Sequence, residues 1–365
     1  MYKKFDEIFE DVTKLGTKVK TDEYHSSGKH QIIDQGQEIV AGYTDLEKGL
    51  FEDVPAIIFG DHTRIIKYVD QPFFLGADGV KVLRSRLEAA NYRYLYYALK
   101  NVKIPNTGYN RHFKWLKTAQ IKWPNAETQS DIVAVLDRIS KIIKYRQRQL
   151  QNLDELIKAR FVELFGDPMQ NSFGWETKPL LEMGYCKNGM NFHTGDSGIA
   201  MHCLGVGDFK DYSVIDGTEH LPTISLNAAP PEESMLQDGD IVFVRSNGNK
   251  ALVGRCVVVY PRNTPTTYSG FCIRYRLTSK VVNTTYLLHV LKTDSIRKKM
   301  AGRGANIQNL NQQILATLNI PLPPIGIQQQ FAAFVEQVDK SKATVQKALD
   351  ETQLLFDSLM QKYFG

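Results

Sequence analysis

Two long segments of the chain place an apolar residue at every third or fourth position, the period of one face of an α-helix. The first stripe has Arg146 as an interruption and runs through Leu136, Ile139, Ile143, Leu150, Leu153, Ile157, Phe161 and Leu164. The second has Ser341 and Thr352 as interruptions and runs through Phe331, Phe334, Val338, Val345, Ala348, Leu355 and Leu359. A stripe held for roughly 30 residues is typical of a coiled coil. The interruptions leave neither helix able to stand alone, so we expect the two to pack on each other within one chain.

The pattern is different in the segments that precede each helix. Short apolar runs rich in β-branched residues predict buried strands at 54–59, 240–244 and 256–260. Turn residues follow the first two runs, at 60–62 and 246–249. Segments 91–99 and 285–300 have the pattern of helices. These parts of the chain are therefore predicted to be mixed α/β.

The same plan occurs twice along the chain. An offset of 199 places Ile121, Pro124 and Gln129 on Ile320, Pro323 and Gln328, and places Phe165-Gly166 on Phe364-Gly365, where the chain ends. The fronts of the two units match more weakly, pairing 8–10 with 180–182, 57–59 with 241–243, and 78–80 with 269–271. Such self-similarity predicts a duplicated unit, each copy being a variable α/β part followed by a helix of fixed length.

Composition narrows the class of protein. The 365 residues include 45 Lys+Arg and 40 Asp+Glu, giving a net charge of +5, with 42% hydrophobic residues. This composition excludes wholesale disorder and suits two or three domains. No apolar run approaches the roughly 18 residues of a membrane span, and the N-terminus has no apolar signal segment, so we expect a cytoplasmic protein.

The positive charge is clustered in two blocks. Ten basic residues and one acid, Glu88, lie between 81 and 122, and twelve basic residues and one acid, Asp294, lie between 245 and 303. Both blocks contain aromatic residues. A single block would favour a solvated basic face, whereas two matched blocks favour contact with a polyanion such as nucleic acid.

Motifs for catalysis or metal binding are missing. The sequence has no P-loop, no H-E-x-x-H and no Asn-Pro-Pro-aromatic tetrapeptide. Asp61-His62 beside Arg64 could form an acid/base pair, but the second copy has Arg245-Ser246-Asn247 there, so contact residues at loop tips are the better interpretation. The cysteines lack zinc-site spacing and are predicted to be free buried thiols: Cys186, Cys203, Cys256 and Cys272.

A proline-rich segment leads directly into the second helix. It reads Ile320-Pro321-Leu322-Pro323-Pro324-Ile325-Gly326-Ile327-Gln328-Gln329-Gln330, with Gly304-Ala305-Asn306-Ile307-Gln308-Asn309-Leu310 just before it, and 120–129 carries a degenerate copy. Together with the duplicated plan, this resembles the specificity subunit of a type I restriction–modification system over essentially the whole chain. The resemblance implies two α/β target recognition domains, 1–125 and 167–324, separated by two conserved spacer helices, 126–166 and 325–365. The helices are then expected to form an antiparallel coiled coil with a pseudo-twofold internal repeat.

The resemblance also implies a non-catalytic function. Such a subunit binds double-stranded DNA at two half-sites and assembles with two methyltransferase subunits and with restriction/translocase subunits, but with no membrane. No cofactor is expected in this chain, since S-adenosylmethionine, ATP and Mg would belong to the partner subunits. A helix over 132–165 would be roughly 50 Å long and would cover about 15 base pairs, so it would fix the spacer between half-sites. Ile142 and Leu156 would either form part of a partner-binding face or be buried within the helix pair.

Candidate DNA-binding residues follow the predicted strands. Arg and Asn make bidentate contacts with guanine and adenine, so the base-reading candidates are His62, Thr63, Arg64, Arg245, Asn247, Asn249 and Lys250. Lys81, Arg84 and Arg86 are candidates for phosphate contact, and Arg303 for backbone or base. Three alternatives stay open: a coiled-coil protein-interaction scaffold, a specificity subunit of a related restriction–modification class, and a standalone DNA enzyme.

Overall fold

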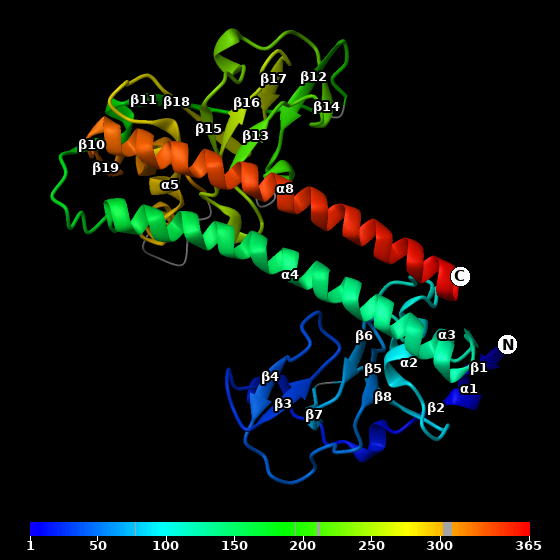
Figure 1. Ribbon diagram of the computed structural model, residues 1–365. Coiled ribbons are helices and arrows are strands. Elements are labelled where there is room, and N and C mark those ends of the chain that lie inside the picture. The colour runs from blue at the N-terminus through cyan, green and yellow to red at the C-terminus, as the bar shows by residue number, and fades with distance from the viewer. Residues whose placement is uncertain (77, 194, 210–211, 302–308) are drawn as a thin grey trace. The chain divides into compact units, whose positions relative to one another are not determined.

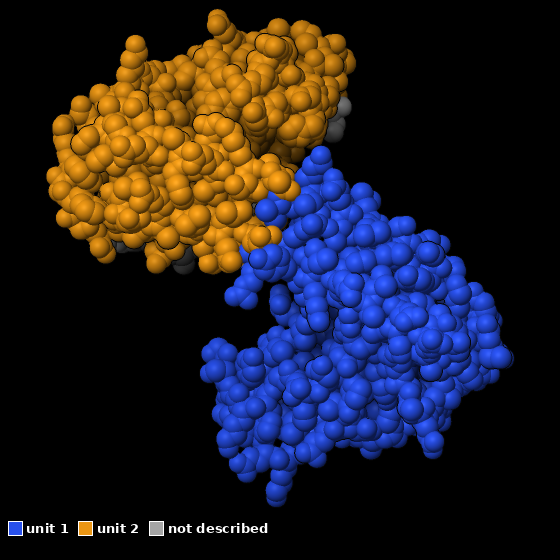
Figure 2. All heavy atoms as spheres, viewed as in Figure 1, with its two compact units in different colours: residues 1–148, 345–365 blue, residues 149–344 orange. Residues whose placement is uncertain are grey.

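The computed structural model describes residues 1–76, 78–193, 195–209, 212–301 and 309–365 (Figure 1). The chain divides into two compact units: unit 1 contains residues 1–148 and 345–365, and unit 2 contains residues 149–344 (Figure 2). Helices α4 (Ala126–Phe165) and α8 (Ile325–Phe364) each belong partly to one unit and partly to the other. Each unit thus combines a globular part with a portion of both helices. The sequence pattern instead predicts the helices as segments separate from the globular domains.

Unit 1 is built on two small sheets. A four-stranded antiparallel sheet has the order β2-β8-β5-β6, a three-stranded sheet has the order β4-β3-β7, and β1 pairs with β9. The elements, besides short 3₁₀ turns, are β1 (Tyr2–Lys4), α1 (Phe5–Ile8), β2 (Phe9–Asp11), β3 (His30–Ile33), β4 (Gly42–Thr44), β5 (Ala56–Gly60), β6 (Ile66–Val69), β7 (Phe73–Leu75), β8 (Val80–Ser85), α2 (Tyr92–Lys100), α3 (Phe113–Leu116) and β9 (Gln120–Lys122).

Alternation along β5 creates two cores in unit 1. Ile57 and Phe59 face the cluster formed with α1, α2 and α4, while Ile58 faces the cluster formed with the three-stranded sheet. All three side chains are fully buried. A strand that is buried on both faces is continuously apolar, which is why the run at 54–59 predicts it.

Unit 2 repeats this arrangement with an additional strand. Its five-stranded sheet has the order β11-β18-β15-β16-β13, its three-stranded sheet has the order β14-β12-β17, and β10 pairs with β19. The elements, besides short 3₁₀ turns, are β10 (Thr177–Pro179), β11 (Gly184–Asn188), β12 (Ile199–Leu204), β13 (Val214–Asp216), β14 (Thr223–Leu226), β15 (Asp240–Val244), β16 (Cys256–Tyr260), β17 (Thr266–Tyr268), β18 (Cys272–Leu277), α5 (Thr284–Lys292), α6 (Asp294–Ala301), α7 (Gln312–Ala316) and β19 (Asn319–Pro321).

The predicted strands at 240–244 and 256–260 are confirmed by β15 and β16. The prediction of a single helix over 285–300 is wrong. The chain leaves the helical conformation at Thr293, and a second helix, α6, begins at Asp294. The Thr293 hydroxyl donates to the Val290 carbonyl at 2.7 Å, a local bond that competes with helix continuation.

Strand pairing corrects the register of the internal repeat. Phe9 pairs with Ser85 as Gly184 pairs with Leu277, so residue 9 matches 184, an offset of 175 and not 172. Gly60 pairs with Val80 as Val244 pairs with Cys272, so the segment 78–80 matches 270–272 and not 269–271. The predicted match of 57–59 with 241–243 is confirmed.

Buried polar contacts recur at matching positions of the two units. The hydroxyl of Tyr94 donates to the carbonyl of Lys122 at 2.6 Å, and that of Tyr286 donates to the carbonyl of Pro321 at 2.8 Å. The side-chain amide of Gln129 donates to the carbonyl of Pro124 at 3.0 Å. Gln328 does the same to Pro323 at 2.7 Å and accepts from the backbone N–H of Asn283 at 2.8 Å. These contacts explain why glutamine recurs at the start of each long helix.

Within unit 1, α4 and α8 meet through apolar and polar contacts. Leu136 and Ile139 share a core with Phe356 and Met360. The prediction that Leu355 belongs to the buried apolar stripe of α8 is wrong, because its side chain is 51% exposed. The polar interruptions of the two stripes contact each other: the Arg146 guanidinium donates to the Thr352 hydroxyl and to the Ala348 carbonyl.

Within unit 2, the same two helices share an aromatic core. Phe161 and Phe165 of α4 lie 5.5 Å, centroid to centroid, from Phe331 of α8. An ion pair of 2.6 Å joins Lys342 to Asp154 beside this core. Among the described residues, no helix has the length and apolar character that crossing a membrane requires.

Candidate nucleic-acid interface

In unit 1, Asp61 follows β5 directly and holds a distant segment in place. Its backbone N–H donates to the Gly79 carbonyl at 2.6 Å, and its carbonyl accepts from the backbone N–H of His112 at 2.8 Å. Its carboxylate, which is 3% exposed, accepts from the N–H of Phe113 at 2.7 Å. The Asp61 carboxylate is thus used to fix the start of α3, which disfavours the acid/base interpretation of Asp61-His62.

The three base-reading candidates of unit 1 lie in the turn between β5 and β6. The Thr63 hydroxyl donates to the Gln35 carbonyl at 2.7 Å, and the backbone N–H of His62 donates to the side-chain oxygen of Gln35 at 3.1 Å. Arg64 adopts a left-handed conformation with φ of 63°, and its guanidinium reaches the carbonyl of Ile104 at 3.5 Å. The turn is therefore tied to residues 35 and 104, far away in sequence.

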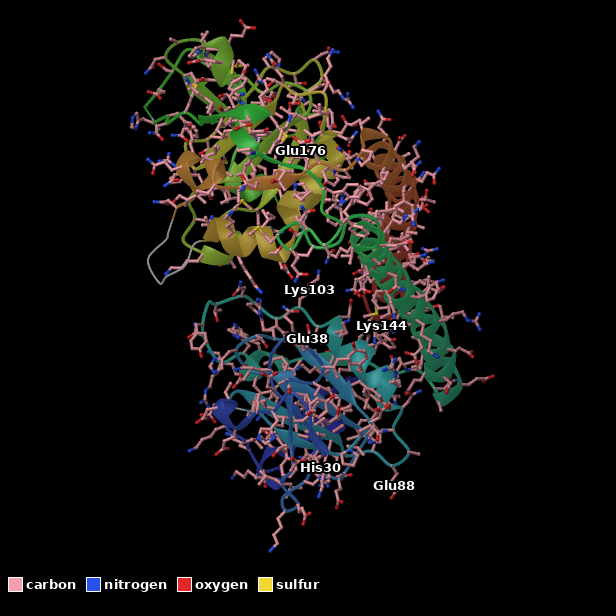
Figure 3. The ribbon with its side chains drawn as sticks, turned by 90° about the vertical axis from the view of Figure 1, so that its left-hand side faces the viewer. His30, Glu38, Glu88, Lys103, Lys144 and Glu176 are labelled. Carbon is pink, nitrogen blue, oxygen red and sulfur yellow. The ribbon has the colours of Figure 1, made fainter. Side chains whose placement is uncertain are left out.

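A loop that the sequence pattern does not single out packs on this turn. The ring of Tyr109 is stacked on the ring of His62, with centroids 4.7 Å apart and planes 8° apart. The same loop, 101–112, exposes Lys103 (labelled in Figure 3), Asn110 and Arg111. Its Pro, Asn and Gly residues within the first basic block are the sequence signal that could have identified it.

The three phosphate candidates of β8 and the loop after it are paired with acids. Lys81 lies 2.9 Å from Asp11, and Arg84 lies 2.5 Å from Glu10 and 2.8 Å from Asp53. Arg86 is 3.8 Å from Glu10. Partial burial opposes the shift, but hydrogen bonds from Thr13 and Lys81 lower the pKa of Asp11 below its usual value.

These acids precede the basic block in sequence, so counting charges within the block misses them. Glu88, the block's own acid, is exposed in the loop between β8 and α2 (Figure 3). The structure gives Lys103 and Arg111 no ion pair among the residues it describes. Lys103 and Arg111 are therefore better placed than the β8 residues to contact phosphates.

In unit 2, Arg245 occupies the position that Asp61 has in unit 1. Its backbone N–H donates to the Phe271 carbonyl at 2.8 Å, as that of Asp61 donates to Gly79, and its carbonyl accepts from Leu310. Among the described residues, its guanidinium donates to the Gly270 carbonyl at 3.2 Å. The two units thus carry different chemistry at equivalent points of one scaffold.

The amide candidates of unit 2 shape the loop that carries them. The side-chain oxygen of Asn247 accepts from the N–H of Asn249 at 2.8 Å, and that of Asn249 accepts from the N–H of Ala251 at 3.0 Å. The structure gives their NH₂ groups no hydrogen bond among the residues that it describes. Lys250 is exposed on the same turn, and Arg303, with most of the 304–310 motif, lies outside the described residues.

The described part of the chain shows no metal-binding cluster and no reactive thiol. It contains no group of three or more His, Cys, Asp or Glu side chains that could hold a metal ion. The cysteines are free, as predicted, and three of them are buried. Burial raises the pKa of Cys186, Cys203 and Cys272 to about 12 and that of Cys256 to about 11, which disfavours the thiolate.

The sequence profile of the type I restriction modification DNA specificity domain matches residues 1–155 and 211–352. The chain belongs to this family. It is 26% identical to the StySPI specificity subunit of Salmonella potsdam over 65% of this chain, an alignment that spans about half (54%) of that relative. It is 21% identical to the EcoR124I/EcoR124II specificity subunit of Escherichia coli over 91% of this chain and 84% of the relative.

A solved structure supports the fold. The type I restriction–modification S subunit from M. genitalium superimposes with a TM-score of 0.59, over all of this chain and 96% of that one, at 16% identity. The predicted resemblance to specificity subunits is thus confirmed at the level of family, together with the α/β fold and the duplicated plan.

Proposed function

We propose that the chain is the DNA-specificity subunit of a type I restriction–modification complex, and that each unit reads one half of a split duplex target. One observation carries this proposal: the same sheet scaffold occurs twice and presents different side chains at equivalent turns. His62 and Thr63 stand in one unit where Ser246 and Asn247 stand in the other. A scaffold that both units share, with different side chains on the turns after its strands, suits two half-sites of different sequence.

The available donors suit base recognition in the major groove. Within the described part of the chain, the Arg245 guanidinium donates to Gly270, which leaves most of its donors for a ligand, and arginine pairs bidentately with guanine. Asn247 and Asn249 retain their NH₂ donors, and asparagine pairs with adenine. Lys103 and Arg111 would contact phosphates, which positions the protein without specifying sequence.

The long helices would set the distance between half-sites. In this proposal they form an antiparallel coiled coil that relates the two recognition domains by a pseudo-twofold axis. Each helix has 40 residues, so it is roughly 60 Å long and would cover about 18 base pairs. One heptad inserted in each helix, after 148 and after 344, would lengthen the unread spacer by about 3 base pairs.

The methylated sequence of each insertion variant tests this length relation. The control carries the heptad in α4 only, which misaligns the two helices and should abolish methylation of any split site. An unchanged spacer in the double insertion would contradict the proposed role of the helices.

The outer faces of the helices would receive the partner subunits. Ile142 and Tyr145 are 39% and 65% exposed in unit 1, and Leu156 and Val162 are 47% and 60% exposed in unit 2. Apolar side chains exposed along a helix are typical of a protein interface, which favours docking over burial for Ile142 and Leu156. Two methyltransferase subunits would dock there and bring S-adenosylmethionine, restriction/translocase subunits would bring ATP and Mg, and the complex would act in the cytoplasm.

The decisive experiment compares the methylome of the host with and without this chain. Loss of one split adenine mark is the expected result. Arg245→Ala should then relax one position of one half-site and weaken binding by about 1–3 kcal/mol, while Arg245→Lys keeps the charge but loses the bidentate contact. A purified complex that binds scrambled DNA as tightly as the methylated sequence, at every salt concentration, would favour the protein scaffold instead.

A further inference from the structure

An exposed tyrosine ring stands over the β5–β6 turn of unit 1. Tyr109 is 87% exposed, and His62 covers one face of its ring. The His62 ring has room because Gly79, at φ of 94°, carries no side chain: a Cβ there would lie 2.8 Å from Cδ2 of His62. The backbone beneath the two rings is thus shaped to accommodate them.

The loop that carries Tyr109 is held at both of its ends. Ile104 accepts from Arg64, and His112, which is fully buried, is bound through its backbone and ring to the carbonyl of Asp61. Inside the loop, the hydroxyl of Thr107 lies 3.3 Å from Nε2 of His112. These contacts fix the ring before any partner arrives, which lowers the entropy cost of binding.

The surroundings of the ring indicate which chemistry it meets. The loop exposes Lys103, Asn106, Asn110 and Arg111, and residues 101–112 include no carboxylate. Hydrogen-bond donors and cations around an aromatic face match a nucleic acid better than an acidic protein. A ring exposed to this extent adds little to folding stability, so its fixed position favours a role in contact.

Unit 2 exposes an aromatic side chain on the segment between β17 and β18, whose backbone contacts the equivalent turn. Phe271 is 62% exposed, and its carbonyl accepts from the backbone N–H groups of Arg245 and Ser246. The residue that matches Phe271 in unit 1 is Gly79, so the two rings are not copies of one ancestral position. Each unit thus exposes an aromatic residue on a segment that contacts the turn after β5 or β15.

We propose that Tyr109 is a specificity-determining residue that packs its free ring face on a thymine methyl group in the half-site bound by unit 1. This inference rests on the proposed function. The 5-methyl of thymine is the apolar group that base pairs present in the major groove, so an aromatic face among donors selects it. His62 is a positioning residue, because its ring is stacked on that of Tyr109; its Nδ1 is buried and has no hydrogen-bond partner among the described residues.

A randomised duplex library, bound by the chain together with its methyltransferase subunits, tests the inference. Tyr109→Ala should lower affinity for the selected target about 10- to 100-fold and relax one or two neighbouring positions of one half-site. Tyr109→Phe keeps the ring and should retain the preference. Tyr2→Ala removes another exposed tyrosine of unit 1 (56% exposed) and should leave it unchanged.

Deoxyuridine, placed at each thymine of that half-site in turn, tests the methyl contact directly in the unmodified protein. One substitution should weaken binding about threefold to fivefold, and the same substitution should cost Tyr109→Ala nothing further. His62→Ala should relax the same positions as Tyr109→Ala, and His62→Phe should restore them.

Three results would overturn the inference: no deoxyuridine effect, an unchanged preference in Tyr109→Ala, or a uniform loss of affinity across all sequences. If the unmodified complex selects no split target, the proposed function itself fails, so the two failures are distinct.

Discussion

Gln328 offers the sharpest test of how the start of each long helix is fixed. Its side chain makes three hydrogen bonds in a fully buried position, to the carbonyls of Pro323 (2.7 Å) and Val281 (3.1 Å) and from the N–H of Asn283 (2.8 Å). Its counterpart Gln129 makes one, to the carbonyl of Pro124 at 3.0 Å. The substitution Gln→Met keeps the length and volume of the side chain and removes only the hydrogen bonds.

The environment of each partner sets the magnitude. Pro323 is buried and Asn283 is half-buried, so their groups lose a partner away from water, which costs about 1–3 kcal/mol each. Val281 is 47% exposed, so water replaces its lost bond at little cost, whereas the half-buried carbonyl of Pro124, like the N–H of Asn283, loses a partner with limited access to water. We therefore expect Gln328→Met to destabilise unit 2 by about 3 kcal/mol and Gln129→Met to destabilise unit 1 by about 1 kcal/mol.

Each unit has a hydrophobic core of its own, so the assay follows each one. Hydrogen exchange at increasing urea, analysed by mass spectrometry of peptides from α5 and from α2, gives a free energy of unfolding for each unit. The N-terminal amides of α5, beside Asn283, should lose the most protection. An equal loss of free energy of unfolding in the two variants, or a larger loss in Gln129→Met, would refute the argument that the cost follows from the number of lost hydrogen bonds and the burial of their partners.

Three further outcomes are expected. Burial lowers the pKa of His289 to about 3, with Lys292 and Lys342 adding to the effect, so the unfolded state binds more protons than the folded one between pH 6.5 and 3. Unit 2 should therefore lose about 1 kcal/mol of its free energy of unfolding per pH unit as the pH falls below 6.5. His289→Phe should remove this pH dependence, measured by urea titrations at pH 7 and pH 5. A pH dependence that survives the substitution contradicts the assignment to His289. Replacing Arg111 by Ala should reduce the salt dependence of DNA binding by about one phosphate contact. Arg84→Ala should change it less, because Glu10 and Asp53 already neutralise the charge of Arg84. A larger change in Arg84→Ala than in Arg111→Ala would contradict the proposal that Arg111 contacts a phosphate. Arg146→Ala should destabilise the helix pair of unit 1 by about 1–2 kcal/mol, measured by exchange of α8 amides, and a cost near zero would show that the bonds to Thr352 and Ala348 are replaced by water.

Local chemistry explains which parts of the fold the sequence predicts well. The apolar runs at 240–244 and 256–260 coincide with β15 and β16, since buried strands are continuously apolar. The helix at 285–300 is predicted as one element because periodicity does not register the bond between Thr293 and Val290. Leu355 and Phe356 are adjacent apolar residues, and only packing places Phe356 in the core and Leu355 at the surface.

The candidate site depends more strongly on contacts between distant residues. Lys81, Arg84 and Arg86 carry the charge that the sequence indicates, but Glu10, Asp11 and Asp53, 31 to 76 residues away, pair with them. His62 is predicted as a base reader, and only the fold stacks its ring on that of Tyr109, which is 47 residues further along the chain.

By itself, the sequence determined the duplicated plan, the two long helices, the proline–glutamine segments and the family, because these depend on periodicity and on residues close together in the chain. The tertiary structure decided the register of the repeat, the partners of Arg146, the neutralised cations of β8 and the aromatic ring held over the β5–β6 turn. The physical reason is that hydrogen bonds, ion pairs and ring stacking act over a few ångströms, and only folding brings residues tens of positions apart within that range.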